Sequence, residues 1–201
     1  MATEVKTRGR GRPDEGARDA LIDAGTQLFI EHDYADVSTD EILRRAGVSR
    51  GALYHHFPGK IDLFRAVYEA TETRAVERVA KAALDATGPF EAMVLTSRAY
   101  LREAETSIEL QRIGIMQSRA VLGWEGWREV ASGLGLGLAA ASLGAAMDAG
   151  EIRRRDLNTT AHVVLAALIE GATLVATAER PGPVRKEVEK VVMDLLEGLR
   201  A

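Results

Sequence analysis

Hydrophobic residues recur every three to four positions along most of the chain, which is the spacing of one face of an α-helix. In the first such segment, residues 14–32, Leu21, Ala24, Leu28 and Phe29 form a single stripe. No segment alternates hydrophobic and polar residues long enough to indicate a β-strand. The pattern therefore predicts an all-α protein.

Glycine and proline interrupt this pattern, with clear breaks at Gly88–Pro89, Gly123, Gly150 and residues 181–183. They divide the chain into about nine predicted helices. These cover residues 14–32, 39–47, 50–57, 60–86, 89–103, 106–118, 124–149, 157–179 and 184–200. Glycines at 133, 135 and 137 would let another helix approach closely, although each weakens its own helix by about 1 kcal/mol relative to alanine.

The two short helices between residues 38 and 57 carry their own start and stop signals. Ser38 or Thr39 can cap the first of them, and Glu41 follows Ser38 at the spacing of a capping box. Gly47 suits the left-handed conformation that ends a helix, and Ser49 can cap the next one. Two short helices joined by so short a turn predict a helix-turn-helix.

A chain of 201 residues with 46% hydrophobic residues can bury a substantial core. It has no cysteine, which excludes disulfides, thiolate zinc sites and a cysteine nucleophile and agrees with a reducing compartment. The charged opening residues do not resemble a secretory signal, so we expect a cytoplasmic protein. The apolar stretch 161–178 contains His162 and Glu170, and we expect it to be a buried helix rather than a membrane span.

The net charge of -4 argues at first against a nucleic-acid partner. However, residues 5–13 contain Lys6, Arg8, Arg10 and Arg12 without any acid, so a basic arm precedes an acidic body. The Arg-Gly-Arg-Pro run in this arm resembles the core of an AT-hook, which enters the minor groove of A·T tracts. A solubilising tail explains the same residues equally well.

The segment VSTDEILRRAGVSRGALYHHFPGKIDL, residues 37–63, resembles the DNA-binding segment of the TetR family. The resemblance rests on the Ser38–Thr39 cap, on residues 46–49, on the run Tyr54–Pro58, and on Lys60 followed by Leu63. It implies a dimeric DNA-binding transcription regulator, in most relatives a repressor. It also implies a helical domain that binds a small molecule.

Within this segment, hydrophobic residues predict the scaffold and polar residues predict the DNA contacts. The residues expected to face inward are Ile42, Leu43, Ala46, Val48, Leu53 and Phe57. The residues expected to contact DNA are Thr39, Ser49, Arg50, Gly51, Tyr54, His55 and Lys60, together with Arg8, Arg10 and Arg12 of the arm. Arg50 can grip a guanine edge or a phosphate, and Tyr54 and Lys60 look like phosphate contacts. Solvated charges and a half-buried tyrosine remain the alternative.

A metal site at His55 and His56 is not expected, because adjacent side chains on a helix point about 100° apart and no third ligand is suitably spaced. The run 135–140 fits a relaxed dinucleotide-binding pattern, but it lies inside a predicted helix with no strand before it. We therefore expect neither an enzyme nor a cofactor. A helical scaffold without DNA remains the third reading, which salt-dependent DNA binding would test.

We predict three parts: a basic arm at residues 1–13, a helix-turn-helix domain at residues 14–60, and a ligand-binding and dimerisation domain at residues 61–201. We expect the last two helices to pair with those of a second copy in a homodimer. We expect no membrane as a partner. The stripe on the final helix consists of Val184, Val188, Val191, Val192, Leu195, Leu196 and Leu199. Such a dimer places two recognition helices about 34 to 36 Å apart and fits a palindromic double-stranded operator.

The resemblance further implies a cavity for a small-molecule effector among the middle helices. Candidate lining residues are Met93, Tyr100, Met116, Gln117, Trp124 and Trp127. Aromatic rings and methionines with few polar groups suit an apolar ligand. Ordinary core packing explains the same residues, and the sequence does not name the ligand.

Overall fold

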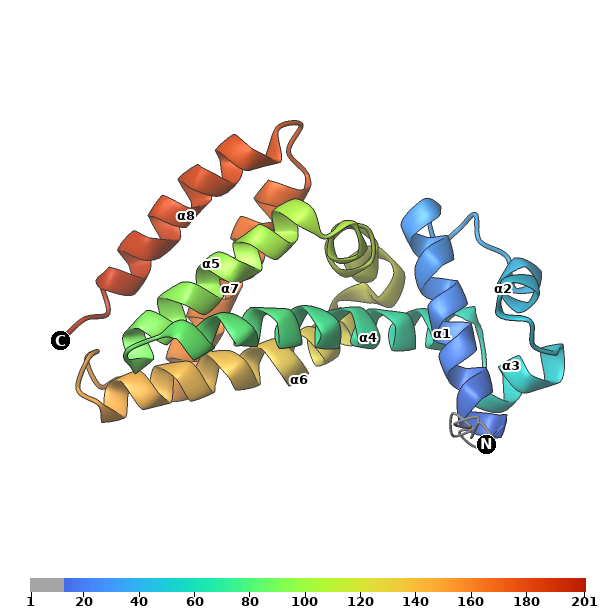
Figure 1. The fold of residues 1–201 in the computed structure, drawn as a ribbon, viewed down its shortest axis with the longest axis horizontal. Helices are drawn as coiled ribbons and strands as arrows, with labels where there is room; N and C mark the ends of the chain where they lie inside the picture. The colour runs from blue at the N-terminus through green and yellow to red at the C-terminus, as the bar shows by residue number, and fades with distance from the viewer. Residues whose placement is uncertain (1–12) are drawn as a thin grey trace, which may run out of the picture. The chain divides into compact units, whose positions relative to one another are not determined.

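The computed structural model describes residues 13–201, with side chains from residue 16 onward, and within that range it is built from helices with no β-sheet (Figure 1). The elements in chain order are α1 (Pro13–Glu31), α2 (Thr39–Ala46), α3 (Arg50–His56), α4 (Lys60–Lys81), the 3-10 helix η1 (Ala82–Asp85), α5 (Pro89–Thr106), the π-helix η2 (Leu110–Gln117), α6 (Ser118–Asp148), α7 (Leu157–Ala176) and α8 (Pro181–Glu197). This confirms the all-α prediction, and helix covers most of each of the nine predicted segments. The predicted break at residues 181–183 is wrong, because α8 begins at Pro181 and proline is accepted in the first turn of a helix.

The start and stop signals of α2 and α3 act as their sequence predicts. The Ser38 hydroxyl accepts a hydrogen bond from the Glu41 amide at 3.1 Å, and the Ser49 hydroxyl accepts one from the Ala52 amide at 3.2 Å. Between the two helices, Gly47 has φ 67° and ψ 27°, the left-handed conformation that costs a residue with a Cβ about 1–2 kcal/mol. The turn therefore depends on a glycine at this position.

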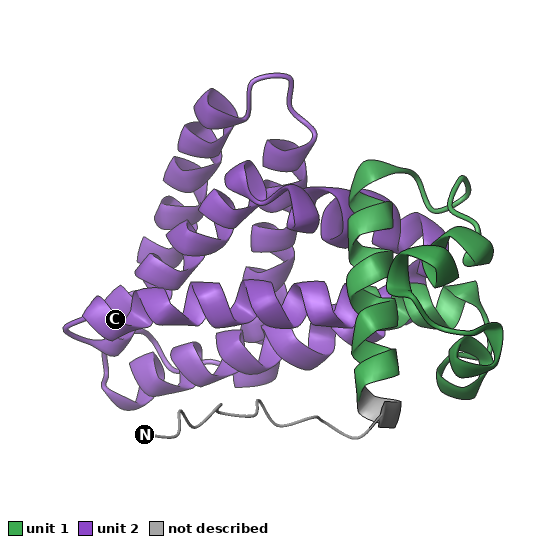
Figure 2. Cartoon of the chain, turned by 45° about the vertical axis from the view of Figure 1, so that its right-hand side comes forward, with its two compact units in different colours: residues 1–67 green, residues 68–201 purple. Residues whose placement is uncertain are grey.

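The chain divides into two compact units, residues 1–67 and residues 68–201 (Figure 2). The boundary falls inside α4, so this one helix supplies residues to both units. In the first unit the predicted stripe of α1 is buried, and Phe29 packs edge-to-face on Phe64 with ring centroids 5.0 Å apart. Ile42, Leu53 and Phe57 complete this core.

Lys60 fixes the loop between α1 and α2 to the first turn of α4. Its Nζ atom donates hydrogen bonds to the backbone carbonyls of Tyr34 at 2.7 Å and Val37 at 2.8 Å. The same ammonium lies 4.1 Å from the centroid of the Tyr34 ring, within the range of a cation–π interaction. Partial burial lowers the pKa of Lys60, an effect that the nearby Asp36 carboxylate opposes.

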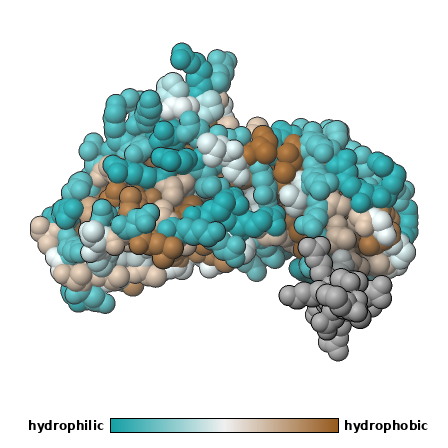
Figure 3. Space-filling view, in the orientation of Figure 1, coloured by the Kyte–Doolittle hydropathy of each residue, from teal (hydrophilic) through white to brown (hydrophobic). Residues whose placement is uncertain are grey.

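In the second unit, α7 contacts α5, α6 and α8. The core that these helices share includes Met93, Leu101, Leu143, Leu168 and Val192, all of which are buried. Figure 3 shows hydrophobic side chains reaching the surface among predominantly hydrophilic ones on the face in view. Burial of the apolar faces of these helices supplies most of the free energy that holds the unit together.

The segment from residue 106 to residue 149 contains two irregularities. Residues 110–117 form a π-helix, and Gly123 interrupts α6 with φ 70° and ψ 176°, at the position where the sequence predicts a break. Farther along α6, Gly135 faces Leu165 of α7 at van der Waals distance. A Cβ built at Gly133 or Gly137 would meet no described atom within 4 Å. Close packing therefore occurs at one of these three glycines.

Two described helical stretches, Leu110–Asp148 and Leu157–Ala176, are long and apolar enough to cross a membrane by length and composition alone. Core helices of water-soluble proteins pass the same criterion, which makes this weak evidence. Both stretches contribute buried residues to the core of the second unit, including Leu143 and Leu168. Burial in this core accounts for part of their apolar character.

Replacing Lys60 with methionine should destabilise the first unit, because two loop carbonyls lose their charged donor while the aliphatic stem is kept. We expect the free energy of unfolding to fall by about 1–3 kcal/mol, measured by chemical denaturation of the purified protein. Lys81→Met, at the exposed far end of the same helix, is the matched control for loss of one charge. Equal stability of Lys60→Met and Lys81→Met would contradict a structural role for the Lys60 ammonium.

Candidate DNA-binding face and ligand cavity

The polar side of α3 is exposed in the way that a recognition helix requires. Ser49, Arg50, Gly51 and His55 are exposed, and 51% of Tyr54 remains accessible to solvent. On the opposite side of the helix, Leu53 is buried in the core of the first unit. A helix fixed by one apolar residue and capped by Ser49 presents its polar residues as a rigid face.

Arg50 is held by an acidic neighbour on this face. Its Nη2 atom donates a hydrogen bond to Oδ1 of Asp40, which lies in the first turn of α2. Both side chains are more than half exposed, so the ion pair stabilises the fold only weakly and exchanges readily for another partner. Arg45 is likewise paired, with Glu31 at 2.9 Å.

The remaining predicted DNA contacts occupy different environments. Thr39 is half-buried at the start of α2. Lys60 is half-buried too, and two of its three ammonium protons are engaged by the loop carbonyls described above. Arg8, Arg10 and Arg12 lie outside the described residues.

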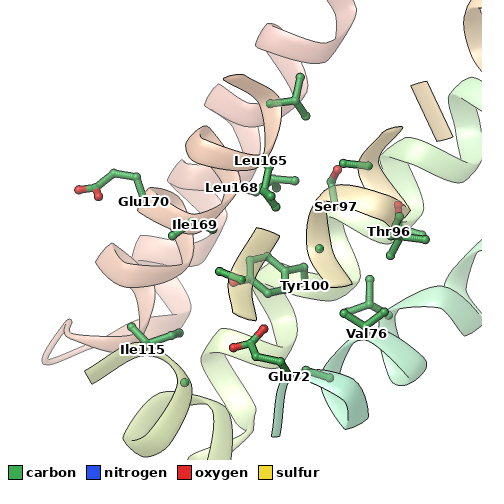
Figure 4. Close-up of a pocket in the computed structure, with 18 of the residues that line it drawn as sticks. Glu72, Val76, Thr96, Ser97, Tyr100, Ile115, Leu165, Leu168, Ile169 and Glu170 are labelled. Carbon is green, nitrogen blue, oxygen red and sulfur yellow. The ribbon is translucent and has the colours of Figure 1, made fainter. Parts of the chain in front are cut away.

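The second unit contains a cavity of about 150 Å³ that is lined by residues of α4, α5, η2, α6 and α7 (Figure 4). Most of its wall is apolar, with Val76, Leu165, Leu168 and Ile169 among the lining residues. A largely apolar cavity of this volume can hold a molecule built around one aromatic ring.

Three of the six residues predicted to line a ligand site do line this cavity, namely Met93, Tyr100 and Trp127. The other three, Met116, Gln117 and Trp124, are absent from its wall. Met116 and Trp124 are exposed, and Gln117 is buried. Arg119, which also lines the cavity, lies with its guanidinium carbon 4.4 Å from the centroid of the Trp127 ring.

Glu72 is a lining residue that the sequence prediction missed. Figure 4 shows its carboxyl group beside the ring of Tyr100 and directed into the cavity, whereas Glu170 points away from it. Burial raises the pKa of Glu72 to about 7. A detectable signal was present, because Glu72 stands at helical spacing from Tyr68, Ala75 and Val79, which are all buried on one side of α4.

Ion pairs and a hydrogen bond hold this part of α4 in place. Arg74 donates to Glu109 through its Nε atom at 3.0 Å, and the Thr71 hydroxyl donates to the same carboxylate at 2.9 Å. One turn later, Arg78 Nε donates to Glu103 at 2.8 Å. These contacts fix the helix that carries Glu72 to α5 and to the start of η2.

The described residues include no group of three or more His, Asp or Glu side chains arranged to hold a metal ion. The rings of His55 and His56 are 5.1 Å apart between centroids and roughly perpendicular, at 71°. Nothing in this arrangement adds a third ligand to the pair.

Comparison with known proteins assigns both units to one family. Residues 21–67 match the family described as bacterial regulatory proteins, tetR family, and residues 90–199 match the tetracyclin repressor-like C-terminal domain. The transcriptional regulator AcuR of Cereibacter sphaeroides is 40% identical over 79 residues, which are 39% of this chain and 36% of AcuR. The match spans only about a quarter to a little over a third of the curated relatives.

Solved structures extend the similarity to almost the whole chain. A TetR-family transcriptional regulator from Pectobacterium atrosepticum is 29% identical with a TM-score of 0.81, covering 96% of this chain and 98% of the other. RolR, solved in complex with resorcinol, is 19% identical with a TM-score of 0.71, covering 92% and 90% of the two chains, and it shows the shared fold alone.

The match to the C-terminal domain by itself spans more than half of the chain, and the match to the N-terminal domain contains the helix-turn-helix described above. Both agree with the exposed polar face of α3 in the first unit and the cavity in the second. The protein therefore belongs to the TetR family of DNA-binding transcriptional regulators.

Proposed function

We propose that this regulator is a repressor that binds a palindromic operator as a homodimer and leaves it when a small, largely apolar effector enters the cavity. The observation that carries the proposal is the exposed polar face of α3, held in place by a buried Leu53 and a capping Ser49. Such a helix fits the major groove of B-DNA. The family to which the chain belongs supports the same reading.

The proposed DNA contacts divide by type. Arg50 would exchange Asp40 for a guanine edge or a phosphate, because its present partner is exposed and weakly held. Ser49, Gly51, Tyr54 and His55 would lie along the groove or its backbone. Thr39, the third ammonium proton of Lys60, and Arg8, Arg10 and Arg12 of the arm would supply further phosphate or minor-groove contacts.

The proposed dimer uses the outer sides of α7 and α8. Val163 and Leu174 on α7 and Val191 and Leu195 on α8 are hydrophobic and each more than half exposed. Large apolar side chains gathered on adjacent helices indicate a surface that a second protein covers. Two copies would pair these helices as a four-helix bundle.

The proposed effector acts through α4. The helix begins at Lys60 in the first unit and lines the cavity with Tyr68, Glu72 and Val76 in the second. A ligand that favours one position of α4 would change the spacing of the two recognition helices and lower operator affinity. We further propose that the protein works in the cytoplasm and has no catalytic activity.

Selection of genomic DNA fragments by the purified protein, read by sequencing, tests the operator proposal. We expect enrichment of a palindrome whose half-sites lie about one helical turn apart. Arg50→Ala should reduce affinity for the selected fragment about tenfold or more, because one bidentate base contact contributes about 1–3 kcal/mol. Asp40→Asn is the matched variant, and it should bind at least as tightly as the parent because it frees Arg50.

Absence of any enriched sequence at low salt would contradict the operator proposal. Equal affinity of Arg50→Ala and the parent would remove Arg50 from the contacts. Expression of a reporter placed behind the selected site, compared with and without the regulator, then separates a repressor from an activator.

The double variant Val191→Glu/Leu195→Glu should convert the dimer into a monomer, since it places two charges on each copy in an apolar contact. Sedimentation equilibrium would measure the change, and operator affinity should fall with it. Leu84→Glu is the control, because Leu84 is 82% exposed and lies outside α7 and α8. A dimer that survives the double substitution would place the interface elsewhere.

A further inference from the structure

The cavity wall carries a carboxyl group, that of Glu72, on the side formed by α4. Glu72 lies on the inner side of α4, with its Oε1 atom 3.0 Å from the position that a Cβ at Gly114 would occupy. A side chain at position 114 would thus crowd the carboxyl group, and glycine there leaves room for it. The carboxyl is enclosed by protein yet open to the cavity (Figure 4).

The serine and threonine hydroxyls of the wall are already satisfied by carbonyls of their own helices. The hydroxyls of Thr96 and Ser97 donate to the Met93 carbonyl, at 3.1 and 2.8 Å, and that of Thr173 donates to the Ile169 carbonyl at 2.9 Å. For Glu72, the described part of the chain offers neither a hydrogen bond nor an ion pair. A buried carboxylate without a partner is costly in free energy, and a bound ligand can provide the missing partner.

The groups around the Glu72 carboxyl favour a ligand of one charge over the other. The Tyr100 ring beside Glu72 presents a π-system that attracts cations (Figure 4). The one guanidinium of the wall, Arg119, lies over the Trp127 ring at 4.4 Å and over the Trp124 ring at 5.0 Å. Glu170 is directed away from the cavity. An anionic ligand would meet the Glu72 carboxylate, whereas a cation would neutralise it.

Resting on the proposed role of this cavity as the effector site, we propose that its ligand is an amphipathic organic cation. The ligand carries an apolar body about the size of one aromatic ring and an amine or quaternary ammonium group. Glu72 is the counter-ion, and the Tyr100 ring provides a cation–π contact. The apolar body occupies the space lined by Val76, Leu165 and Leu168.

Ionisation of Glu72 makes this binding dependent on pH. Because burial raises its pKa to about 7, the carboxyl is about one tenth ionised at pH 6 and about nine tenths ionised at pH 8. The other titratable groups on the wall are Tyr68 on α4, Tyr100 on α5, Arg119 on α6 and Glu170 on α7, while η2 contributes only Gly114 and Ile115. Burial raises the pKa of both tyrosines and keeps them neutral. A permanently charged ligand should therefore bind about tenfold more tightly at pH 8 than at pH 6.

Two probes of nearly equal shape test the proposal. Benzyltrimethylammonium carries the charge, and neopentylbenzene replaces its nitrogen with carbon. Binding to the full-length protein is measured by calorimetry and by thermal shift at pH 6 and pH 8. We expect the cation to bind about tenfold or more tightly than the neutral probe at pH 8, and Glu72→Gln to abolish that preference. Glu77→Gln, exposed on the same helix, is the matched control that keeps it.

The neutral probe also reports whether the variant is folded, because Glu72→Gln should bind neopentylbenzene at least as well as the parent does. The proposal is overturned if the neutral probe binds as tightly as the cation, if neither binds, or if Glu72→Gln keeps the preference. An affinity for the cation that is equal at pH 6 and pH 8 would also overturn it.

Release of the selected operator fragment is measured separately with the same probes. Binding of the cation through Glu72 without release of DNA supports the ligand class and contradicts effector-driven release. Release of DNA by the neutral probe alone supports effector-driven release and contradicts the proposed ligand class. The two proposals therefore fail in distinguishable ways.

Discussion

A single helix, α4, has to satisfy two hydrophobic cores. Leu63, Phe64 and Val67 are buried in the first unit, and Tyr68, Ala75 and Val79 are buried in the second. Because the residues of each set recur at helical spacing, each set lies on the face of α4 that packs into its own unit. Replacement of a residue in either set by a polar one would therefore disturb the core of that unit.

In each unit, polar side chains donate hydrogen bonds to backbone carbonyls. In the first unit the Lys60 ammonium satisfies two loop carbonyls that no helix or sheet would pair. In the second, hydroxyls on the cavity wall bond to carbonyls of their own helices. Glu72 departs from this pattern, and unsatisfied polar groups in an otherwise consistent structure are most often found where function requires them.

Local signals in the sequence were sufficient for the first unit. Capping serines, Gly47 and the stripe of α1 act through contacts within a few residues, and the structure confirms each of them. For the second unit, the family resemblance and residue type suggested Met93, Tyr100 and Trp127, which line the cavity. Met116 and Trp124, suggested on the same grounds, lie outside its wall in a stretch of irregular backbone.

Residue type does not fix the direction of a side chain, and in this stretch the backbone does not allow it to be extrapolated. A π-helix places more residues in each turn than an α-helix, so the direction of Met116 cannot be extrapolated from a period of 3.6 residues. Gly123 then changes the direction of the chain just before Trp124. Glu72 was missed because the prediction favoured aromatic and methionine side chains, which passes over an acidic residue even where helical spacing places it inside. The basic arm lies outside the described residues, so its role stays a prediction.

The glycines of α6 weaken the helix that forms one side of the cavity. Gly133 and Gly137 weaken the helix by about 1 kcal/mol each relative to alanine, and no described neighbour packs closely enough on them to offset this loss. Between them, Gly135 lies on the cavity wall itself. Segments with weak helix propensity and few close contacts open at the lowest free-energy cost. The stretch of α6 around Gly135 is therefore a part of the cavity wall that its own helix propensity stabilises weakly.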